Sequence, residues 1–430
     1  MNKINLGIIG YGQIGKELVS VLLKKKSELR RKIEVDVNID SICDIDLAKL
    51  QLADLKGISL CRDAKEIINN KEIDVIIELI GGVHPAEEYI LAALKNKKHV
   101  ITANKALLSQ SLAKICKVAN ENNVNVYFEA SVGGGIPIIK SLREGLVAND
   151  IQEIFAIING TCNFILSEMA WEGSGFKKAL EKAQEEGYAE ADSSLDIDGW
   201  DSAHKLAILS SLVYSMDVKL KDIYVEGIRN IDPLDIKYSQ EFGYSLKLLA
   251  IAKKKKGKLR LSVHPALLPK EYLLSQVRGS FNAIYIKGDL AGKMIFYGRG
   301  AGPYPTSSAI ISDLINLVVD LKRDVNFKKI ELKPSGEKMS VQDFQDVSCR
   351  YYLRIMALDQ PGALSTISGI LSSHKISIAS VIQKERHQEK AVPIVMLTHH
   401  ALEKDMQKAV QEIHQLSFVK KKPDLIRIQT

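Results

Sequence analysis

Residues 187–214 carry the densest set of reactive side chains in the sequence, GYAEADSSLDIDGWDSAHKLAILSSLVY. The carboxylates of this stretch are Glu190, Asp192, Asp196, Asp198 and Asp201. Lys205 follows Asp201 by four residues, and on an exposed helix such a pair is a salt bridge contributing roughly a few tenths of a kcal/mol. No charged residue occurs from Leu206 to Met216, however, and apolar residues fall on every side, which indicates a buried helix. A lysine entering such a helix beside carboxylates has a tunable protonation state, as proton transfer near neutral pH requires, and the carboxylates suit a substrate ammonium group.

A glycine-rich turn, GYGQIG, lies near the N-terminus between an apolar stretch and a helical pattern. The first glycine allows a tight turn, the second lets the backbone approach a pyrophosphate, and the third lets the helix pack on the strand. The turn therefore predicts a dinucleotide site, and the alternative is a turn that serves packing alone. The predicted cofactor contacts are Gly10, Tyr11, Gly12, Gln13, Ile14 and Gly15.

The end of the second predicted strand bears on the choice between NAD and NADP. An acidic residue there binds the ribose 2′-hydroxyl, whereas an arginine accepts a 2′-phosphate. The stretch IDSICDID offers Asp40, Cys43 and Asp44 and no arginine. This favours NAD with Asp44 as a contact, although Asp44 would equally serve to begin a turn.

Two further loops follow predicted strands, at the edge where open α/β sheets bind ligands. In TANKALL, Lys105 can face a nicotinamide and a substrate; the alternative is a solvated lysine, but the helix dipole opposes a cation in a first turn. In EASVGGGIPII, Glu129 and backbone carbonyls could coordinate a hard cation, although the residues alone favour a structural hinge. Two more turns follow at residues 159–164 and 298–306. Their residue types do not decide between a functional role and a simple connection.

These loops need a scaffold, and the pattern up to residue 130 predicts a Rossmann-type parallel sheet of alternating strands and helices. The strands are expected at Ile4–Ile9, Glu34–Ile42, Asp74–Ile80, His99–Thr102 and Val124–Glu129. The helices are expected at Ile14–Lys26, Pro85–Lys95 and Lys105–Asn122.

The remainder of the chain predicts two more domains. Residues 131–340 are expected to form a mixed α/β catalytic and dimerisation domain, with strands at Ile151–Ile158 and Ala283–Lys287 around a mostly helical stretch. A charged segment from Asp324 to Asp346 suits a connector. Residues 348–430 show a βαββαβ order, which is the ferredoxin-like arrangement.

Composition narrows the functional classes. A length of 430 residues predicts two to four domains, and a net charge of +7 without aromatic-interleaved basic runs does not indicate nucleic acid binding. The lysine runs at 24–26, 253–256 and 420–422 suit solvated helix ends or turns. Five scattered cysteines suggest neither a disulfide framework nor a zinc site, and no apolar segment is long enough for a membrane span. We expect a cytoplasmic protein without a membrane partner.

The motifs together resemble one enzyme family. GYGQIG, TANKALL, EASVGGGIP, NGTCNFIL, GYAEADSSLDIDGWDSAHKL and GRGAGPYPT stand in the order found in homoserine dehydrogenases, and the last 80 or so residues resemble an ACT domain, a regulatory module that binds amino acids. The resemblance covers nearly the whole chain. It implies NAD(P)-dependent interconversion of L-aspartate 4-semialdehyde and L-homoserine, on the route to threonine, methionine and isoleucine.

The resemblance also implies roles for individual residues. Lys205 would be the proton donor to the carbonyl oxygen, Lys105 would assist it, and Gly302 would lie near the cofactor. The substrate would contact Glu190, Asp196, Asp201, Gly160 and Thr161. A monovalent cation, sodium or potassium, would be held by Glu129 and by backbone oxygens of Val132, Gly134 and Ile136.

One position departs from the family pattern, and some alternatives stay open. Many relatives have arginine where this chain has Cys43, which puts a strong NADP preference in doubt. Malate-type and semialdehyde dehydrogenases share the glycine fingerprint, but no cysteine here has a convincing histidine partner for thioester chemistry. The non-enzymatic alternative is an NAD(P)-binding amino-acid sensor. The ACT resemblance implies threonine as an effector near Asp359–Gly362, or a role in dimerisation alone, within a homodimer or homotetramer.

Overall fold

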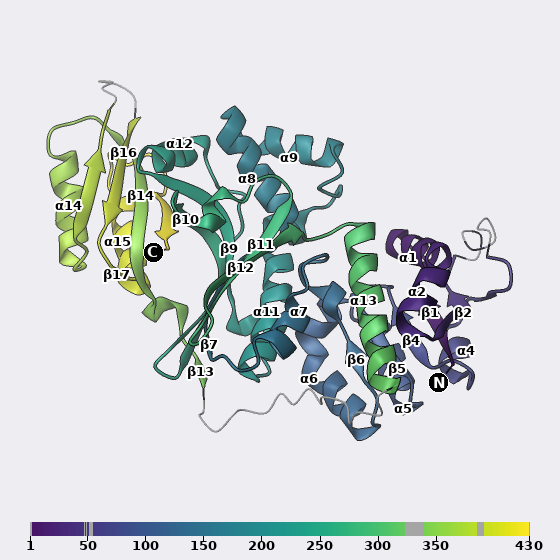
Figure 1. Ribbon diagram of the computed structural model, residues 1–430. Coiled ribbons are helices and arrows are strands. Elements are labelled where there is room, and N and C mark those ends of the chain that lie inside the picture. Colours follow the sequence, from purple (N-terminus) through teal and green to yellow (C-terminus); the bar gives the residue numbers. More distant parts are fainter. Residues whose placement is uncertain are drawn as a thin grey trace. The chain divides into compact units, whose positions relative to one another are not determined.

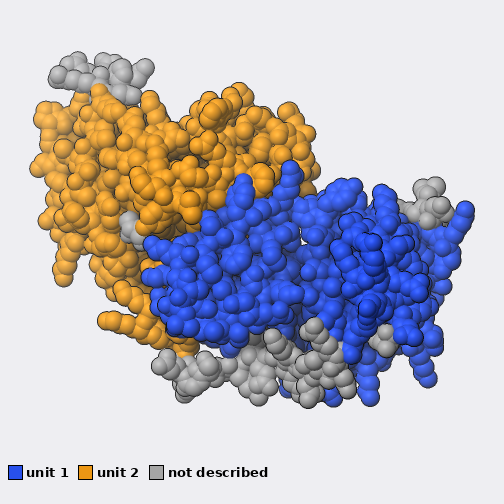
Figure 2. All heavy atoms as spheres, in the orientation of Figure 1, with its two compact units in different colours: residues 1–152, 203–222, 282–338 blue, residues 153–202, 223–281, 339–430 orange. Residues whose placement is uncertain are grey.

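The computed structural model describes residues 2–46, 48, 50, 55–322, 339–384 and 391–429. The chain divides into two compact units, which Figure 2 colours separately. Unit 1 comprises residues 1–152, 203–222 and 282–338, and unit 2 comprises residues 153–202, 223–281 and 339–430. Most of the predicted connector, residues 324–338, lies outside the described residues.

Unit 1 is built on a parallel six-stranded sheet in the order β3-β2-β1-β4-β5-β6 (Figure 1). The strands are β1 (Lys3–Ile9), β2 (Asp36–Cys43), β3 (Ser59–Cys61), β4 (Val75–Glu78), β5 (His99–Thr102) and β6 (Val126–Tyr127). This order reverses direction between β1 and β4, and ligands of open α/β sheets bind outside the carboxyl ends of the strands at that switch point. The predicted Rossmann-type sheet is therefore confirmed.

The helices of this sheet are α1 (Gln13–Lys24), α2 (Lys26–Ile33), α4 (Ala64–Asn69), α5 (Ala86–Lys95) and α6 (Lys105–Glu121). Asp63 caps α4 and Asn104 caps α6 with their side chains, whereas no side chain caps α1, which begins after Gly12. The sheet core includes the strand residues Leu6, Ile8 and Val75. The long helix α13 (Pro303–Lys322) packs against α1 and adds Leu314 and Leu317 to the same core.

Several details of the N-terminal prediction differ from the structure, including the helices α2 and α4, which were not predicted. The strand expected at Val124–Glu129 ends at Tyr127, and Glu129 begins a 3-10 turn, η1 (Glu129–Ser131). Strand β3, which pairs with β2 in parallel, was not predicted, because a three-residue edge strand has too little apolar periodicity to stand out. Unit 1 also contains α7 (Ile138–Lys140), the π-helical turn η2 (Ser141–Gly145) and most of β11 (Phe281–Gly288), which pairs with β12 (Gly292–Arg299).

In unit 2 the strands follow the order β7-β9-β10-β18-β14-β16-β15. The helices before the central hairpin are α8 (Gly160–Glu172), α9 (Phe176–Glu185), α10 (Ser194–Ile197) and α12 (Pro233–Glu241). Strand β7 (Ile151–Ile157) was predicted. The largest error of the sequence analysis is the hairpin of β9 (Tyr244–Lys255) and β10 (Lys258–Pro269), which lies where a mostly helical stretch was expected. Both strands are buried along most of their length. β9 contains the continuous apolar run of residues 248–252, which also fits a buried helix, whereas residues 259–263 of β10, LRLSV, alternate between apolar and polar and were a strand signal that the sequence analysis did not use.

The C-terminal module shows the predicted ferredoxin-like order. It consists of β14 (Ser348–Leu358), α14 (Ala363–Ser373), β15 (Ile378–Ile382), β16 (Ala391–Thr398), α15 (Glu403–His414) and β18 (Asp424–Ile428). It has its own core, which includes Leu353, Ile367 and Met406. Its last strand also pairs in parallel with β10, so the sheet of the module continues the sheet of the hairpin (Figure 1). Sequence periodicity did not predict this junction.

Within the described part of the chain, no helix combines the length and apolar character needed to cross a membrane.

Candidate active site

The glycine-rich turn lies at the switch point of the parallel sheet. Gly10 has φ of +106°, and a Cβ there would lie 2.8 Å from the carbonyl carbon of Leu79 in the loop after β4. A Cβ on Gly15 would lie 2.3 Å from the carbonyl oxygen of Gly10, which only glycine avoids. A Cβ on Gly12 would meet no atom within 4 Å, so this side of the turn is open. The geometry matches the three tasks assigned to the glycines, and the amide groups of the uncapped α1 terminus suit a phosphate.

Asp44 lies directly beside this turn, at the end of β2. Its carboxylate accepts hydrogen bonds from the backbone N–H of Tyr11 at 2.7 Å and of Asp46 at 2.9 Å. The backbone N–H of Gly10 donates to the carbonyl oxygen of Cys43 at 2.8 Å. Burial, with a smaller contribution from Cys61, raises the pKa of the Cys43 thiol to about 12, so Cys43 is a neutral side chain here. Asp44 thus bonds to the glycine turn through Tyr11, and its bond to Asp46 fits the alternative that it begins a turn.

An arginine also lies at this end of β2, which the sequence analysis missed. Arg62 follows β3, and its Nε donates to the carbonyl oxygen of Ile45 at 3.1 Å. Because β2 and β3 are parallel and Cys43 pairs with Cys61, the residues that follow the two strands emerge side by side. Arg62 is distant from Asp44 in the sequence, so only a prediction of β3 beside β2 would have placed it at this site.

A second missed residue is Glu78, the last residue of β4, whose side chain is completely buried. Its carboxylate accepts hydrogen bonds from Thr102 Oγ1 at 2.6 Å and from the backbone N–H of Ile80 and Gly81 at 2.9 and 3.3 Å. Burial raises the pKa of Glu78, and these hydrogen bonds partly offset that effect. A single acidic residue in an otherwise apolar strand, VIIELI, was the available signal.

Asn104 links Glu78 to the predicted catalytic Lys105. Its Nδ2 donates to Gly82 O at 2.7 Å and, more weakly, to Glu78 Oε1 at 3.4 Å, while its Oδ1 accepts from the backbone N–H of Leu107 at 3.1 Å. This last bond caps α6, whose first residue is the half-buried Lys105. The first turn of α6 is therefore fixed relative to the loop after β4.

The carboxylate of Glu129 is bonded to the backbone a short way along the chain. It is buried and accepts hydrogen bonds from the backbone N–H of Ile139 at 2.8 Å and of Lys140 at 2.7 Å. The backbone N–H of Glu129 donates to Asp313 Oδ2 at 2.9 Å. Burial raises the pKa of both carboxyl groups, and for Asp313 the neighbouring Glu129 adds to the effect. Glu129 thus holds the start of α7 and shapes the loop at residues 132–136.

Other residues of this loop and the loop at 298–302 lie close together in unit 1. Val132, Gly134 and Ile136 are buried, and a Cβ on Gly134 would lie 2.6 Å from the carbonyl oxygen of Gly300. Gly302 is exposed, has φ of +110° and directly precedes α13. Among the residues that the structure describes, no three His, Cys, Asp or Glu side chains form a metal-binding group.

Helix α11 (Trp200–Tyr214) is buried, as the absence of charge in its sequence predicted. Asp201 is 3% exposed and Lys205 is 7% exposed, and the following Leu206 and Ala207 are completely buried. A surface salt bridge is thereby excluded as the reason for the Asp201–Lys205 spacing. Asp201 belongs to unit 2 and Lys205 to unit 1, so α11 passes from one unit into the other.

In unit 2, an asparagine gathers the predicted substrate carboxylates. Asn159 Nδ2 donates to Asp196 Oδ1 at 2.7 Å and to Asp201 Oδ2 at 2.8 Å, and Asn159 Oδ1 caps α8 through the backbone N–H of Cys162. Gly160 and Thr161 are the first residues of α8, and Thr161 Oγ1 donates to the carbonyl oxygen of Tyr188 at 2.6 Å. The sequence analysis singled out the turn at 159–164 but did not place Asn159 in the site.

Glu190 differs from the other predicted substrate residues because it is exposed, and the structure shows its backbone carbonyl accepting from Gln184. The two carboxylates that are brought together within unit 2 are those of Asp196 and Asp201. Asp196 lies in residues 194–198, a short segment that includes α10 and is called the substrate loop below, and Asp201 lies just after it in the first turn of α11.

Comparison with known proteins agrees with these features. Residues 10–129 match the NAD-binding domain model of homoserine dehydrogenase, residues 137–315 match the homoserine dehydrogenase model, and residues 351–418 match the ACT domain model. The homoserine dehydrogenase of Neisseria gonorrhoeae is 39% identical over 433 residues, covering 100% of this chain and 99% of the relative.

Two solved homoserine dehydrogenases also match, one over the whole chain and one over about three quarters of it. A homoserine dehydrogenase from Thiobacillus denitrificans superposes with a TM-score of 0.93 at 39% identity, covering 100% of this chain and 99% of that one. A hyperthermophilic archaeal homoserine dehydrogenase, solved in complex with NADPH, has a TM-score of 0.64 at 27% identity and covers 76% of this chain and 99% of its own. The buried Lys205, the glycine turn at the sheet switch point and these full-length matches lead to one conclusion: the chain belongs to the homoserine dehydrogenase family.

Proposed function

We propose that Lys205 is the proton donor in the reaction of this family, the NAD(P)-dependent interconversion of L-aspartate 4-semialdehyde and L-homoserine. The observation that carries the proposal is the burial of this single lysine, 7% exposed, one helical turn beyond Asp201 in a helix otherwise free of charge after it. The alternative of a sensor without catalysis is not favoured, because the family is one of oxidoreductases.

The residues divide the chemical task among them. When bound, the nicotinamide carries the hydride exchanged with the carbonyl carbon. Lys205 gives a proton to the carbonyl oxygen in the reducing direction and takes it back from the homoserine hydroxyl in the other. Lys105 assists at the same oxygen from the first turn of α6, which Asn104 and Glu78 fix in place. The reaction requires the substrate and the two lysines to be held in a fixed geometry, and rigid helices provide it.

Asp196 and Asp201 are proposed to bind the substrate ammonium group and neighbouring polar groups. Asn159 holds both carboxylates by hydrogen bonds of 2.7 and 2.8 Å, so their orientation is set before a substrate arrives. Thr161 and Gly160, at the start of α8, are proposed to line the same pocket. Glu190 is proposed to close it from the exposed part of the loop.

For the cofactor, we propose that Gly10–Gly15 hold the pyrophosphate, that Asp44 lies at the ribose and that Gly302 lies nearby. Asp44 favours the 2′-hydroxyl of NAD, whereas Arg62 brings a cation to the same end of β2 that suits the 2′-phosphate of NADP. The chain is therefore proposed to use either cofactor. The archaeal relative solved with NADPH supports the second of these.

A monovalent cation, sodium or potassium, is proposed in the loop after Glu129. The donors that fit are the Glu129 carboxylate and the backbone oxygens of the buried Val132, Gly134 and Ile136. Each Glu129 oxygen accepts one backbone N–H and keeps a further lone pair for a cation. The function of the cation would then be to keep the loop in shape.

We also propose threonine as an effector at the ACT module, a homodimer or homotetramer as the assembly, and the cytoplasm as the location.

Replacement of Lys205 tests the catalytic proposal. Lys205→Met removes the proton donor and keeps an apolar stem of similar length in the buried helix, so homoserine-dependent reduction of NAD and NADP should fall at least about 1,000-fold while the fold stays intact. The matched variant Lys105→Met should lose most of its activity but less than Lys205→Met. Circular dichroism and thermal unfolding check the fold. Near-normal turnover in a folded Lys205→Met variant would reject the assignment.

A further inference from the structure

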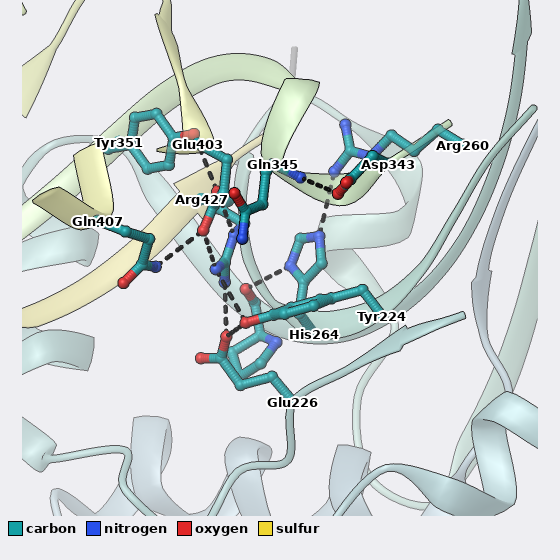
Figure 3. Close-up of polar contacts among 11 residues, drawn as sticks. Tyr224, Glu226, Arg260, His264, Asp343, Gln345, Tyr351, Glu403, Gln407 and Arg427 are labelled. Carbon is teal, nitrogen blue, oxygen red and sulfur yellow. Dashed lines mark hydrogen bonds and ion pairs between the residues drawn. The ribbon is translucent and has the colours of Figure 1, made fainter. Parts of the chain in front are cut away.

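A buried charge cluster connects the C-terminal module to the short strand β8 (Tyr224–Val225) and the residue after it, as Figure 3 shows. Its centre is Arg427 of β18, which is 1% exposed. Arg427 Nε and Nη2 donate to the two carboxylate oxygens of Glu403 at 2.9 and 2.5 Å, and Nη1 donates to Glu226 Oε2 at 2.6 Å. One guanidinium therefore holds a carboxylate of its own module and a carboxylate of the preceding domain.

Aromatic side chains fix the geometry of this cluster. Tyr224 Oη donates to Glu226 Oε2 at 2.7 Å, and Arg427 Nη2 donates to the same hydroxyl at 3.1 Å. The Tyr224 ring stacks on Phe344 with centroids 3.7 Å apart, and the guanidinium lies 5.0 Å from each ring centroid. Burial opposes the charge on Arg427, but its carboxylate partners raise its pKa well above the usual value. A buried ion pair of this kind is costly to break, so its partners are held in place.

Glu226 begins a segment that lies directly against the substrate loop. A Cβ on Gly227 would lie 2.2 Å from the carbonyl oxygen of Ile197 and 2.5 Å from the Cα of Asp198, so only glycine allows this approach. The backbone N–H of Ile228 donates to the carbonyl oxygen of Ile197 at 2.8 Å. The two backbones are in direct contact, and a displacement of one moves the other.

The side chain of Arg229 also forms hydrogen bonds to the substrate loop. Its Nη2 donates to Asp198 Oδ2 at 2.9 Å and to Ser194 Oγ at 3.1 Å, and its Nε forms a further bond to Asp198. On the other side, Asn159 holds Asp196 at 2.7 Å. The loop is thus fixed between segment 226–229 and the first turn of α8.

We propose that Arg427 is a positioning residue for substrate binding. Through Glu226 it fixes segment 226–229, and this segment holds the substrate loop so that Asp196 faces the substrate. The inference rests on the proposed role of Asp196 and goes beyond it, because it assigns to the C-terminal module a contribution to homoserine binding even without an effector.

The chain contains a matched control for the burial and charge of Arg427. Arg354, on β14 of the same module, is also 1% exposed. It donates to both oxygens of Asp235 at 2.6 and 2.9 Å and lies 2.8 Å from Asp424. A third carboxylate, that of Asp232, lies 3.3 Å from Arg354. Asp235 is on α12, Asp232 is the N-cap of α12 and Asp424 is on β18, so none of the three partners belongs to segment 226–229. Loss of Arg354 costs a buried ion pair without removing the link to Glu226.

The test compares Arg427→Met, Glu226→Gln and Arg354→Met in the full chain by steady-state kinetics and urea unfolding. We expect Arg427→Met and Glu226→Gln each to raise KM for homoserine about tenfold, with KM for the nicotinamide cofactor changed less than about twofold. Arg354→Met should lower the free energy of unfolding as Arg427→Met does and leave KM for homoserine near the wild-type value. The double variant of Arg427 and Glu226 should be no worse than Arg427→Met alone.

An equal rise of KM in Arg354→Met would overturn the proposal, because general destabilisation would then explain the effect. An unchanged KM in Arg427→Met would also overturn it. Should Arg427→Met fail to fold, Glu226→Gln decides, since Glu226 is partly exposed and its amide retains the Tyr224 bond. Asp196→Asn separates the two levels of inference: if it raises KM and the cluster variants do not, positioning by Arg427 is wrong and the substrate site stands. If Asp196→Asn leaves KM unchanged, the substrate site itself is wrong.

Discussion

At the residue scale, several features of the candidate site depend on polar side chains to which the sequence analysis assigned no role. Glu78 ties the loop after β4 to Thr102 and Asn104, and Asn159 orients two carboxylates of the substrate-binding region. A buried polar group without a partner is costly, so each of these side chains fixes the backbone or side-chain groups it bonds. The residues proposed to touch the substrate are in this way held by residues that need not touch it.

The clearest prediction at this scale concerns Arg62. Arg62→Ala should raise KM for NADP about tenfold, because a guanidinium bonded to a phosphate contributes on the order of 1.5–3 kcal/mol. KM for NAD should change less than about twofold. Initial rates with homoserine as substrate and each cofactor varied in turn measure both values.

Asp44→Ala is the matched variant at the same end of β2. It removes the acceptor for Tyr11 N–H and the proposed ribose contact, so it should weaken NAD binding more than NADP binding.

For the Arg62→Ala variant, an equal change of KM for NAD and for NADP would rule out the proposed contact between Arg62 and the 2′-phosphate.

At the element scale, the pairing of β5 with β6 contains a pH-sensitive bond. The backbone N–H of Asn125, just before β6, donates to His99 Nδ1 at 3.0 Å, and burial lowers the pKa of His99 to about 4, with Asp74 opposing the shift. Protonation of His99 would destroy the acceptor. The unfolded chain binds a proton near pH 6.5, whereas the folded chain binds it only near pH 4, so this contribution to stability is lost as the pH falls between these values.

We therefore expect the free energy of unfolding to fall between pH 7 and pH 4.5 by an amount to which His99 contributes on the order of 2 kcal/mol. His99→Asn keeps an acceptor oxygen near the position of Nδ1 but has no titrating group, so its pH dependence should be shallower by that amount. Urea unfolding of both proteins at the two pH values measures the difference. Parallel pH profiles would show that His99 does not contribute.

The elements also show where sequence patterns succeed. β1, β5 and α6 were predicted within one or two residues, because a buried parallel strand is an uninterrupted apolar run and α6 begins at an asparagine cap. The β9–β10 hairpin was missed because the apolar run of residues 248–252 in β9 also fits a buried helix, and the alternating residues 259–263 of β10 were not used. β3 was missed because it is short, and Arg62 was missed with it.

At the scale of the whole molecule, the C-terminal module is proposed to respond to threonine. Gly362, at the start of α14 in the loop after β14, has φ of +88°, a conformation that strains any residue with a side chain. L-Threonine should inhibit homoserine oxidation by the wild-type chain. Gly362→Ala should weaken that inhibition at least about tenfold and leave turnover without threonine near normal, as dose–response curves would show. Unchanged activity at saturating threonine would instead favour a role in assembly alone.

The sequence by itself determined the family, the Rossmann-type sheet, the ferredoxin-like module and the identity of Lys205 as a buried lysine. These features can be predicted from local patterns, because a glycine turn, an apolar run or a charge-free helix consists of residues that are consecutive in the sequence. Tertiary structure decided what lies across the fold: Arg62 beside the end of β2, Asn159 between Asp196 and Asp201, and Arg427 against Glu226. The bonded residues are far apart in the sequence, from 17 positions for Arg62 and Ile45 to 201 positions for Arg427 and Glu226. Only strand pairing and packing bring such distant groups within hydrogen-bonding distance.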